Sequence, residues 1–256
     1  MCLVVLAWDV SERYPLIFAA NRDERHERPT RTAAWWPDHP TVFGGRDLVA
    51  HGSWLGIDRA GRIAAVTNLR DADVKPAARS RGDLVADYLT GSDSIDAFID
   101  RIGTQSSDYG PFGLLLFDRA ELTYYSNRAP HARLGRGIHA LSNAPLGVEW
   151  PKTRTAKHSM RGALDHDDLP AALFALLAQQ DPQATGDARY RSSLFIEGQI
   201  YGTRSSSVIL VSSDGELTFA ERSFDTEAAL TRETSERIQL PAVSTSALPS
   251  AARDRR

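Results

Sequence analysis

The amino-acid sequence predicts an α+β fold in which two mostly antiparallel sheets pack face to face between layers of helices, a four-layer αββα sandwich. Three observations favour it. The strand candidates are nearly continuous apolar runs, which are typical of sheets buried on both faces. Short turn sequences separate most neighbouring strand candidates, which indicates hairpins and antiparallel pairing. The helical patterns are grouped and do not alternate with the strands, which favours layered sheets and helices.

The first part of the chain alternates between apolar runs and turns. Residues 2–8 and 15–20 are β-rich and apolar and predict two buried strands, joined by a polar turn at 9–13. A polar, arginine-rich segment at 21–31 and a loop with two tryptophans and two prolines are expected next. Residues 53–57 and 63–67 flank the sequence Asp58-Arg59-Ala60-Gly61, which predicts a hairpin.

Helices and further hairpins are expected in the rest of the chain. Residues 83–88 and 94–102 carry apolar side chains at helical spacing, and Ser94 is a good N-cap for the second of these helices. The other predicted helices are 153–164 and 169–178. The remaining predicted strands are 112–117, 122–125, 138–141, 194–196, 208–211 and 217–220.

The length and composition favour a single domain. A chain of 256 residues with 42% hydrophobic content can form one large domain with a substantial core, which we expect at residues 1–230. Residues 231–256 are polar and rich in Ser and Ala, which predicts a loosely ordered C-terminal tail.

Charge and cysteine content argue against several classes of function. Lys and Arg number 30 against 33 Asp and Glu, so no basic field favours a nucleic-acid partner. The chain has one cysteine, which excludes an internal disulfide, and His26, His39 and His51 lack metal-ligand spacing. The apolar run at 2–8 is too short to span a bilayer. We therefore expect a cytoplasmic protein without a transmembrane segment, a metal or a required cofactor.

The single cysteine, Cys2, carries the chemistry that the sequence suggests most directly. Removal of Met1 would leave a thiol and a free α-amine on one residue. An α-amine titrates near pH ~8 and a thiol near ~8.5, so the amine can take the thiol proton. Taken alone, however, Cys2 is better explained as a small apolar residue that starts a buried strand.

The polar segment Asn21-Arg22-Asp23-Glu24 strengthens the chemical interpretation. It follows the second predicted strand, so a hairpin between the first two strands would bring it beside Cys2. A guanidinium near a thiol lowers the thiol pKa, and a carboxylate can hold an ammonium in place. The alternative is a solvated charged loop.

Several sequence blocks resemble the signature blocks of the NRDE family, which includes the transport and Golgi organisation protein 2 group. They occur in order between residue 1 and about residue 212. The blocks are Met1-Cys2, Asn21-Arg22-Asp23-Glu24, Gly44-Gly45-Arg46-Asp47, Gly52-Ser53-Trp54-Leu55-Gly56, Thr67-Asn68, Ser80-Arg81-Gly82, Leu141-Ser142-Asn143 and Gly202-Thr203-Arg204-Ser205-Ser206-Ser207. Ser53 stands where the family often has Thr.

A more distant resemblance is to N-terminal nucleophile (Ntn) hydrolases of the penicillin V acylase, bile salt hydrolase and acid ceramidase group. It implies that Cys2 attacks a carbonyl, that Arg22 steadies the thiolate and that Asp23 holds the α-ammonium. In those enzymes intervening residues separate the arginine from the aspartate, which are adjacent here.

The same resemblance implies three further site residues. Asn68 or Asn143 would supply an oxyanion donor, and Arg204 would complete the polar site. An asparagine amide at a strand end offers two N–H donors, although an Asx turn explains Asn68 equally well. Arg204 lies among small polar neighbours, which leave room for an anionic ligand or suit a surface turn.

Two functions therefore stay open. The first is a Cys2-dependent amidase or acyl hydrolase that acts on a small amide. The second is a non-catalytic binding or trafficking protein, for which the NRDE resemblance implies haem or acyl-coenzyme A and other lipid-like anionic ligands. The ligand-binding residues would be Asn21, Arg22, Asp23, Glu24, Arg46 and Trp54.

Overall fold

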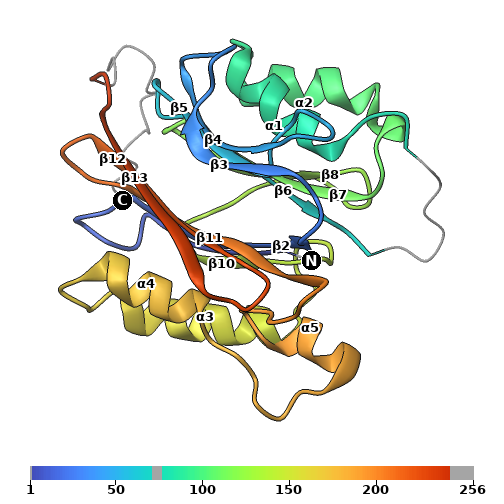
Figure 1. Cartoon of the computed structure of the whole chain (residues 1–256). Helices are drawn as coiled ribbons and strands as arrows, with labels where there is room; N and C mark the ends of the chain where they lie inside the picture. Colours follow the sequence, from blue (N-terminus) through green and yellow to red (C-terminus); the bar gives the residue numbers. More distant parts are fainter. Residues whose placement is uncertain (1, 71–76, 243–256) are drawn as a thin grey trace, which may run out of the picture.

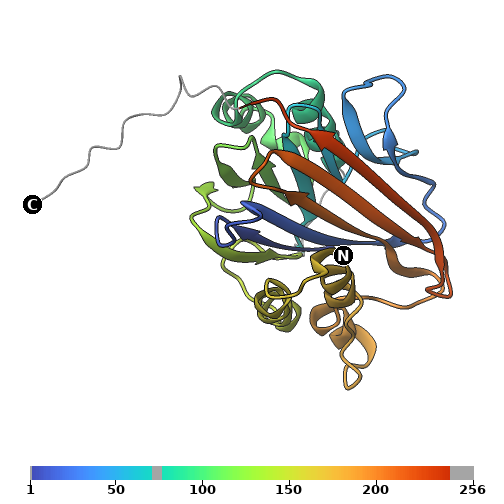
Figure 2. The same ribbon diagram turned by 90° about the vertical axis from the view of Figure 1, so that its left-hand side faces the viewer.

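The chain forms two antiparallel sheets between two layers of helices, which confirms the αββα sandwich (Figure 1). The computed structural model describes residues 2–70 and 77–242. Helices α1 and α2 cover the outer face of one sheet, and α3, α4 and α5 lie on the outer face of the other (Figures 1 and 2). No helix in these residues combines the length and apolarity needed to cross a membrane.

The first sheet, called sheet A here, has six strands in the described residues, in the order β10-β1-β2-β11-β12-β13. Their bounds are β1 (Leu3–Trp8), β2 (Leu16–Arg25), β10 (Gly137–Leu141), β11 (Tyr201–Val211), β12 (Glu216–Phe224) and β13 (Leu230–Gln239). Sheet B has seven strands in the same residues, in sequence order from β3 to β9. These are β3 (Thr30–Trp35), β4 (Val42–Asp47), β5 (Leu55–Asp58), β6 (Ile63–Asn68), β7 (Phe112–Phe117), β8 (Leu122–Ser126) and β9 (Ala132–Arg133).

Four longer helices match the predicted ones. They are α1 (Arg81–Thr90), α2 (Ile95–Gly103), α3 (Pro151–Ala163) and α4 (Leu169–Leu177), and the shorter elements are η1 (Ser106–Asp108), η2 (Gly186–Ala188) and α5 (Arg189–Ser192). Ser94 caps α2 as predicted, because its side chain accepts a hydrogen bond from the Ala97 amide at 3.3 Å.

Three expectations about strands were wrong. Residues 21–25 continue β2, because β11 pairs with β2 along its whole length and gives these polar residues main-chain partners. Residues 30–35, expected as the end of the charged segment and the start of a loop, form β3, which pairs with β4 at residues 42–47. Residues 194–196 do not form a strand.

The expected tail at 231–256 also needs correction. Residues 230–239 form β13, which pairs with β12 along nearly its full length. Its charged side chains fit an exposed edge strand, where alternate side chains face solvent. Residues 243–256 of the predicted tail lie outside the described residues.

Three clusters of apolar side chains hold the layers together. The largest lies between the two sheets, where the rings of Phe43 and Phe219 meet edge to face with centroids 5.2 Å apart. A second joins sheet A to α3 and α4 through residues such as Leu3 and Met160. The third joins sheet B to α1 and α2. The sandwich thus has an apolar interior on both sides of each sheet.

A buried carboxylate also ties the sheets together. Glu221 lies on β12 in sheet A and is 2% exposed. It accepts hydrogen bonds from the Ala33 amide on β3 of sheet B, at 2.8 Å, and from the Ser207 hydroxyl, at 3.1 Å. Glu221 therefore satisfies a main-chain donor that the pairing of β3 with β4 leaves free at a register shift between Arg31 and Ala34.

We expect the substitution Glu221→Ala to lower the free energy of unfolding by about 1–3 kcal/mol, because it leaves buried donors without an acceptor. Urea denaturation measures the change. The matched control Glu227→Ala removes an exposed carboxylate from the turn between β12 and β13 and should change stability by less than about 0.5 kcal/mol. Equal stability of the two variants would show that Glu221 does not tie the sheets together.

Candidate functional site

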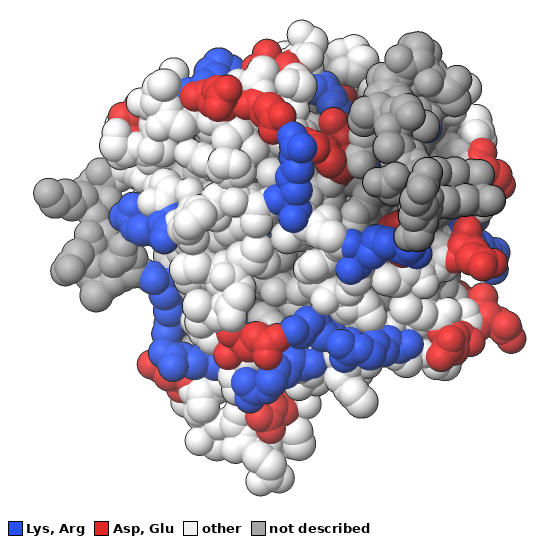
Figure 3. All heavy atoms as spheres, turned by 180° about the vertical axis from the view of Figure 1, so that it is seen from behind, with Lys and Arg blue, Asp and Glu red and all other residues white. Residues whose placement is uncertain are grey.

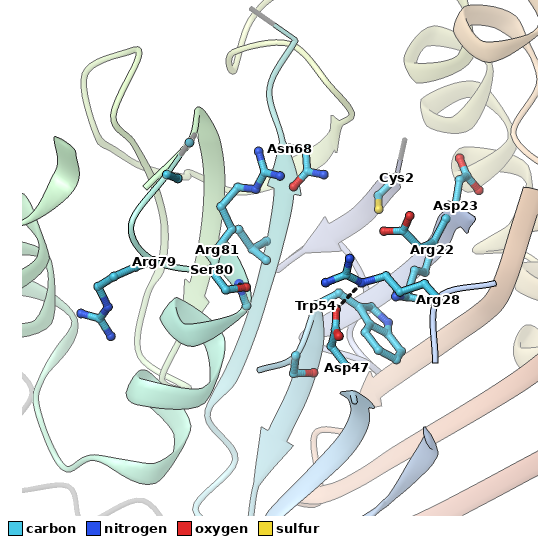
Figure 4. Close-up of a pocket in the computed structure, with 16 residues that line it drawn as sticks. Cys2, Arg22, Asp23, Arg28, Asp47, Trp54, Asn68, Arg79, Ser80 and Arg81 are labelled. Atoms are coloured by element: carbon cyan, nitrogen blue, oxygen red, sulfur yellow. Dashed lines mark hydrogen bonds and ion pairs between the residues drawn. The ribbon is translucent and has the colours of Figure 1, made fainter. Parts of the chain in front are cut away.

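A cavity of about 470 Å³ opens at the end of the sandwich where the first strand begins (Figure 4). Cys2 and residues of β2 line one side of it. The end of β6 and the start of α1 line the other side. The described lining residues are Cys2, Arg22, Asp23, Glu24, Arg28, Asp47, Ser53, Trp54, Val66, Asn68, Ala77, Arg79, Ser80, Arg81, Gly82 and Gly110.

The pairing of β1 places Cys2 at this cavity. Leu3 lies opposite Asn21 on β2, and Val4 lies opposite Leu141 on β10. Continued to Cys2, these registers place it between Arg22 on β2 and Asn143 after β10. The Ser142 hydroxyl donates a hydrogen bond to the Cys2 carbonyl at 2.7 Å. Cys2 is half-buried, and its thiol points into the cavity (Figure 4).

Arg22 brings a buried positive charge next to Cys2. The residue is 5% exposed, and its guanidinium lies 4.1 Å from the centre of the Trp54 ring. Burial lowers the pKa of Arg22, and the nearby charges of Cys2 and Glu24 oppose this shift. Within the described residues, Nη1 has no hydrogen-bond partner and no carboxylate lies within ion-pair distance of Arg22. This arrangement favours a negative charge in the cavity.

The glycine-rich blocks of the sequence shape this surface. A Cβ on Gly45 would lie 2.2 Å from ring atoms of Trp54, so only glycine lets the indole lie flat beneath Arg22. A Cβ on Gly52 would lie 2.4 Å from the main chain of Gly82, so this glycine lets the first turn of α1 approach the cavity wall.

Asp23 faces the opposite side of β2 from Arg22, toward the layer of α3 and α4. Its carboxylate accepts a hydrogen bond from the Thr203 hydroxyl at 2.8 Å, and its main-chain oxygen accepts one from Tyr201 at 2.9 Å. Asp23 is buried, and burial raises its pKa, while the positive charges of the N-terminal amine and of Lys152 oppose this shift. Asp23 is thus a buried carboxylate next to the start of β1.

Asn68 and Arg81 lie across the cavity from Cys2 (Figure 4). Asn68 is exposed at the end of β6, so its amide is available to a ligand. Arg81 begins α1 and donates to the Pro111 carbonyl at 3.3 Å, and burial lowers its pKa. Arg81 belongs to the block Ser80-Arg81-Gly82, but nothing in the sequence around it indicated that it would line the site.

Two predicted ligand residues lie away from the cavity. The Asn21 amide donates to the carbonyls of Leu177 and Leu194, and its oxygen accepts from the Ser206 hydroxyl, so Asn21 anchors α4 to sheet A. Arg46 makes a two-pronged ion pair with Asp38 and stacks on Trp36. The polar groups of both side chains are thus occupied by other residues of the protein and are not available to a ligand in the cavity. Glu24 does line the cavity, as predicted.

Arg204 is the extra residue of a β-bulge. Thr203 pairs with Asp23 and Ser205 with Arg22, so Arg204 has no opposite residue on β2. Its Nη1 donates to the carbonyls of Arg25, His26 and Arg28 at 3.0–3.2 Å. It lines a smaller neighbouring cavity with Arg22 and Trp54, and not the cavity at Cys2. The expected convergence of Arg204 on Cys2 is therefore not seen.

Asn143 joins the two sheets behind the cavity. Its amide donates to the Asn68 carbonyl at 2.6 Å, and its own carbonyl accepts from the Arg70 amide at 2.9 Å. Ser142 meanwhile binds the Cys2 carbonyl. Asn143 thus positions the strand end that carries Asn68 and does not itself line the cavity, which leaves Asn68 as the asparagine facing Cys2.

Charges on the surface are mixed. On the face opposite to that of Figure 1, Lys and Arg side chains lie next to Asp and Glu side chains (Figure 3). At the cavity, Arg28 pairs with Asp47 at 2.6 Å, and Arg79 pairs with Asp87 at 2.9 Å. Among the described residues, no cluster of His, Cys, Asp and Glu side chains could hold a metal ion.

The chain is similar to known proteins over most of its length. The family model described as "Transport and Golgi organisation 2" matches residues 1–226. The Transport and Golgi organization protein 2 homolog of Bos taurus is 34% identical, over 87% of this chain and 93% of its own. The human homolog is 31% identical over the same shares, and the Drosophila melanogaster protein is 28% identical over 86% of this chain and 91% of its own.

Solved structures share the fold at low sequence identity. The Caenorhabditis elegans ortholog of N-acylethanolamine-hydrolyzing acid amidase superposes with a TM-score of 0.52 and 11% identity, over 82% of this chain and 92% of its own. A variant of conjugated bile acid hydrolase from Clostridium perfringens gives a TM-score of 0.50 and 8% identity, over 95% and 99%. These likenesses show an Ntn-hydrolase-like fold.

We expect Gly45→Ala to lower the free energy of unfolding by about 1–3 kcal/mol, because the added methyl group displaces Trp54 from beneath Arg22. Urea denaturation measures the stability, and near-ultraviolet circular dichroism reports the changed tryptophan environment. The control Gly162→Ala adds the same methyl group within α3, where nothing lies within 4 Å, and should stabilise the helix by about 0.5–1 kcal/mol. If Gly45→Ala were as stable as this control, the position of the Trp54 ring would not require a glycine at residue 45.

Proposed function

The chain belongs to the Transport and Golgi organisation 2 family, and we propose that it is an Ntn-type hydrolase of small amides with Cys2 as nucleophile. The observation that supports this proposal most is the arrangement of Cys2, Arg22, Asp23 and Asn68 around one cavity. These groups match the parts that such a reaction requires: a nucleophile, its charge partners and an oxyanion donor. The fold likeness is consistent with it but does not carry it.

The reaction begins after removal of Met1, which frees the α-amine of Cys2. The amine takes the thiol proton, and Sγ attacks the carbonyl carbon of the amide, forming a C–S bond and an oxyanion. The C–N bond then breaks, and the α-ammonium returns its proton to the leaving nitrogen. Water, deprotonated by the α-amine, hydrolyses the thioester and releases the acid, and Sγ takes back a proton.

Residues around Cys2 stabilise the charges that form in these steps. Arg22 lies on the side of Cys2 that faces Trp54, where a positive charge favours the thiolate. Asp23 offers a carboxylate for the α-ammonium. Asn68 lies across the cavity, where its amide can donate to the oxyanion.

A second function has separate support. Arg22 and Arg81 both line the cavity, and neither has a carboxylate within ion-pair distance among the described residues. Two such guanidinium groups suit a ligand with a carboxylate or phosphate group. The chain would then bind an anionic ligand such as haem or acyl-coenzyme A without turnover.

For the hydrolase we expect Cys2→Ala to abolish amide cleavage, by at least about 10³-fold in kcat, because the attacking atom is gone. Cys2→Ser should keep some turnover or accumulate an ester that intact mass spectrometry detects. A bulky residue at position 2 that retains Met1 should also abolish cleavage, because the amine is then part of an amide. Cleavage that is indifferent to Cys2 would rule out this mechanism.

For the binding function we expect the opposite pattern. Arg22→Ala and Arg81→Ala should weaken binding of palmitoyl-coenzyme A or haemin by about tenfold or more, because each removes a charge-assisted contact. Cys2→Ala should bind like the wild type. The control Arg25→Ala removes an exposed arginine of β2 that pairs with Glu27. Fluorescence or absorbance titration measures the affinities, and equal affinities in all variants would exclude this cavity as the ligand site.

A further inference from the structure

Lys152 places a buried ammonium behind the candidate site. It is the second residue of α3 and is 0% exposed, although lysine is almost never fully buried unless it is paired. Its Nζ has no hydrogen-bond partner in residues 2–70 and 77–242, and it lies 6.0 Å from the centroid of the Trp150 ring. A buried ammonium without hydrogen bonds is costly, so its position calls for a compensating negative charge.

The helix makes this position still less favourable. Lys152 lies in the first turn of α3, where the helix dipole is positive and disfavours a cation. Burial lowers the pKa of Lys152, while the charges of Asp23 and Cys2 oppose this shift. The positive charge of Arg70, two residues after β6, also lowers the pKa of Lys152. Of the groups that affect the pKa of Lys152, only Asp23 and Cys2 therefore favour its charged form.

The packing of α3 fixes this arrangement. Ala156 and Met160 of α3 pack against Leu3 and Val5 of β1, so the helix lies under the strand that Cys2 begins. Lys152 therefore lies on the helix side of sheet A, as does Asp23. Arg22 lies on the opposite side, against Trp54 of sheet B. The start of β1 lies between two buried cations.

We propose that Lys152 is a positioning residue for the nucleophile, whose buried ammonium keeps the Asp23 carboxylate ionised so that it can fix the α-ammonium of processed Cys2. This role rests on the proposed Cys2 chemistry. In the reactive state the thiolate and the Asp23 carboxylate are negative, and the α-ammonium and Lys152 are positive. These four charges balance, and Arg22 adds a further positive charge beside the sulfur.

The pH dependence of Cys2 alkylation tests this role without a substrate. Iodoacetamide reacts with the thiolate, and intact mass spectrometry reports both the reaction and the absence of Met1. We expect Lys152→Met to move the midpoint of the alkylation profile up by about 1 pH unit or more. The sign follows because loss of the Lys152 cation disfavours the Asp23 carboxylate. Without that carboxylate the α-ammonium is no longer held beside the sulfur, so the thiolate forms at a higher pH. Lys152→Arg should keep the wild-type midpoint.

Two controls separate this role from a structural one. Lys157→Met makes the same substitution on the same helix, at a residue that pairs with Glu149 outside the site, and should leave the profile unchanged. If Lys152→Met does not fold, the double variant with Asp23→Asn removes both buried charges and should fold. Its profile should then match that of Asp23→Asn alone, because Lys152 acts through Asp23.

An unchanged midpoint in folded Lys152→Met would overturn the proposal, because Lys152 would then be neutral or without influence on Cys2. The proposal would also be overturned if folded Lys152→Arg, with the melting temperature of the wild type, had the alkylation midpoint of Lys152→Met. In the double variant, a midpoint well above that of Asp23→Asn alone would overturn the action through Asp23. Absence of amide cleavage by the wild-type protein would instead count against the proposed hydrolase function, and the alkylation profile would still test Lys152.

Discussion

The antiparallel register of β1, β2 and β11 determines the site. Side chains on a strand alternate between faces, so a shift of one residue between β1 and β2 would turn Arg22 toward the helices and Asp23 toward sheet B. The observed register sets Cys2 beside Arg22. The bulge at Arg204 then lets Thr203 meet Asp23 while Ser205 pairs with Arg22. The opposite wall of the cavity comes from sheet B, the start of α1 and the loops next to them. Ser142 and Asn143 connect the two sides.

This end of the sandwich concentrates buried charge. Arg22, Asp23, Lys152 and Glu221 are each at most 5% exposed. Isolated charges in such positions cost several kcal/mol each, so the fold keeps them only by placing opposite charges and hydrogen bonds nearby. Burial lowers the pKa values of the two cations and raises those of the two carboxylates. Such opposed shifts in one region are typical of functional sites, although structural charge networks produce them too.

The sequence allowed prediction of the fold where apolar periodicity and turn chemistry agree. The hairpins β1–β2, β5–β6 and β7–β8, the four longer helices and the Ser94 cap follow from local patterns. The strands β3 and β13 could not be predicted this way, because their side chains are mostly polar or exposed and pairing with neighbours makes them strands. The pairing of β2 with β11 likewise extends a strand through polar residues.

The candidate site was predicted less completely. Cys2, Arg22, Asp23, Glu24, Trp54 and Asn68 line the cavity as expected, whereas Asn21, Arg46, Asn143 and Arg204 have structural partners. Residue type and order cannot distinguish these cases, because the alternation of a strand decides which side chain faces the cavity. Lys152 gave no sequence signal at all, since a lysine near a helix start is normally solvated.

The outer strand β13 has a consequence for association. It is the last strand of sheet A in the described part of the chain, and an edge strand presents main-chain groups that can pair with a strand of another molecule. Arg232, Glu233, Glu236 and Arg237 place both signs of charge along this edge. A strand of another molecule that paired with β13 would have to remove these charges from water. The polar composition of this segment therefore protects the open sheet against edge-to-edge aggregation.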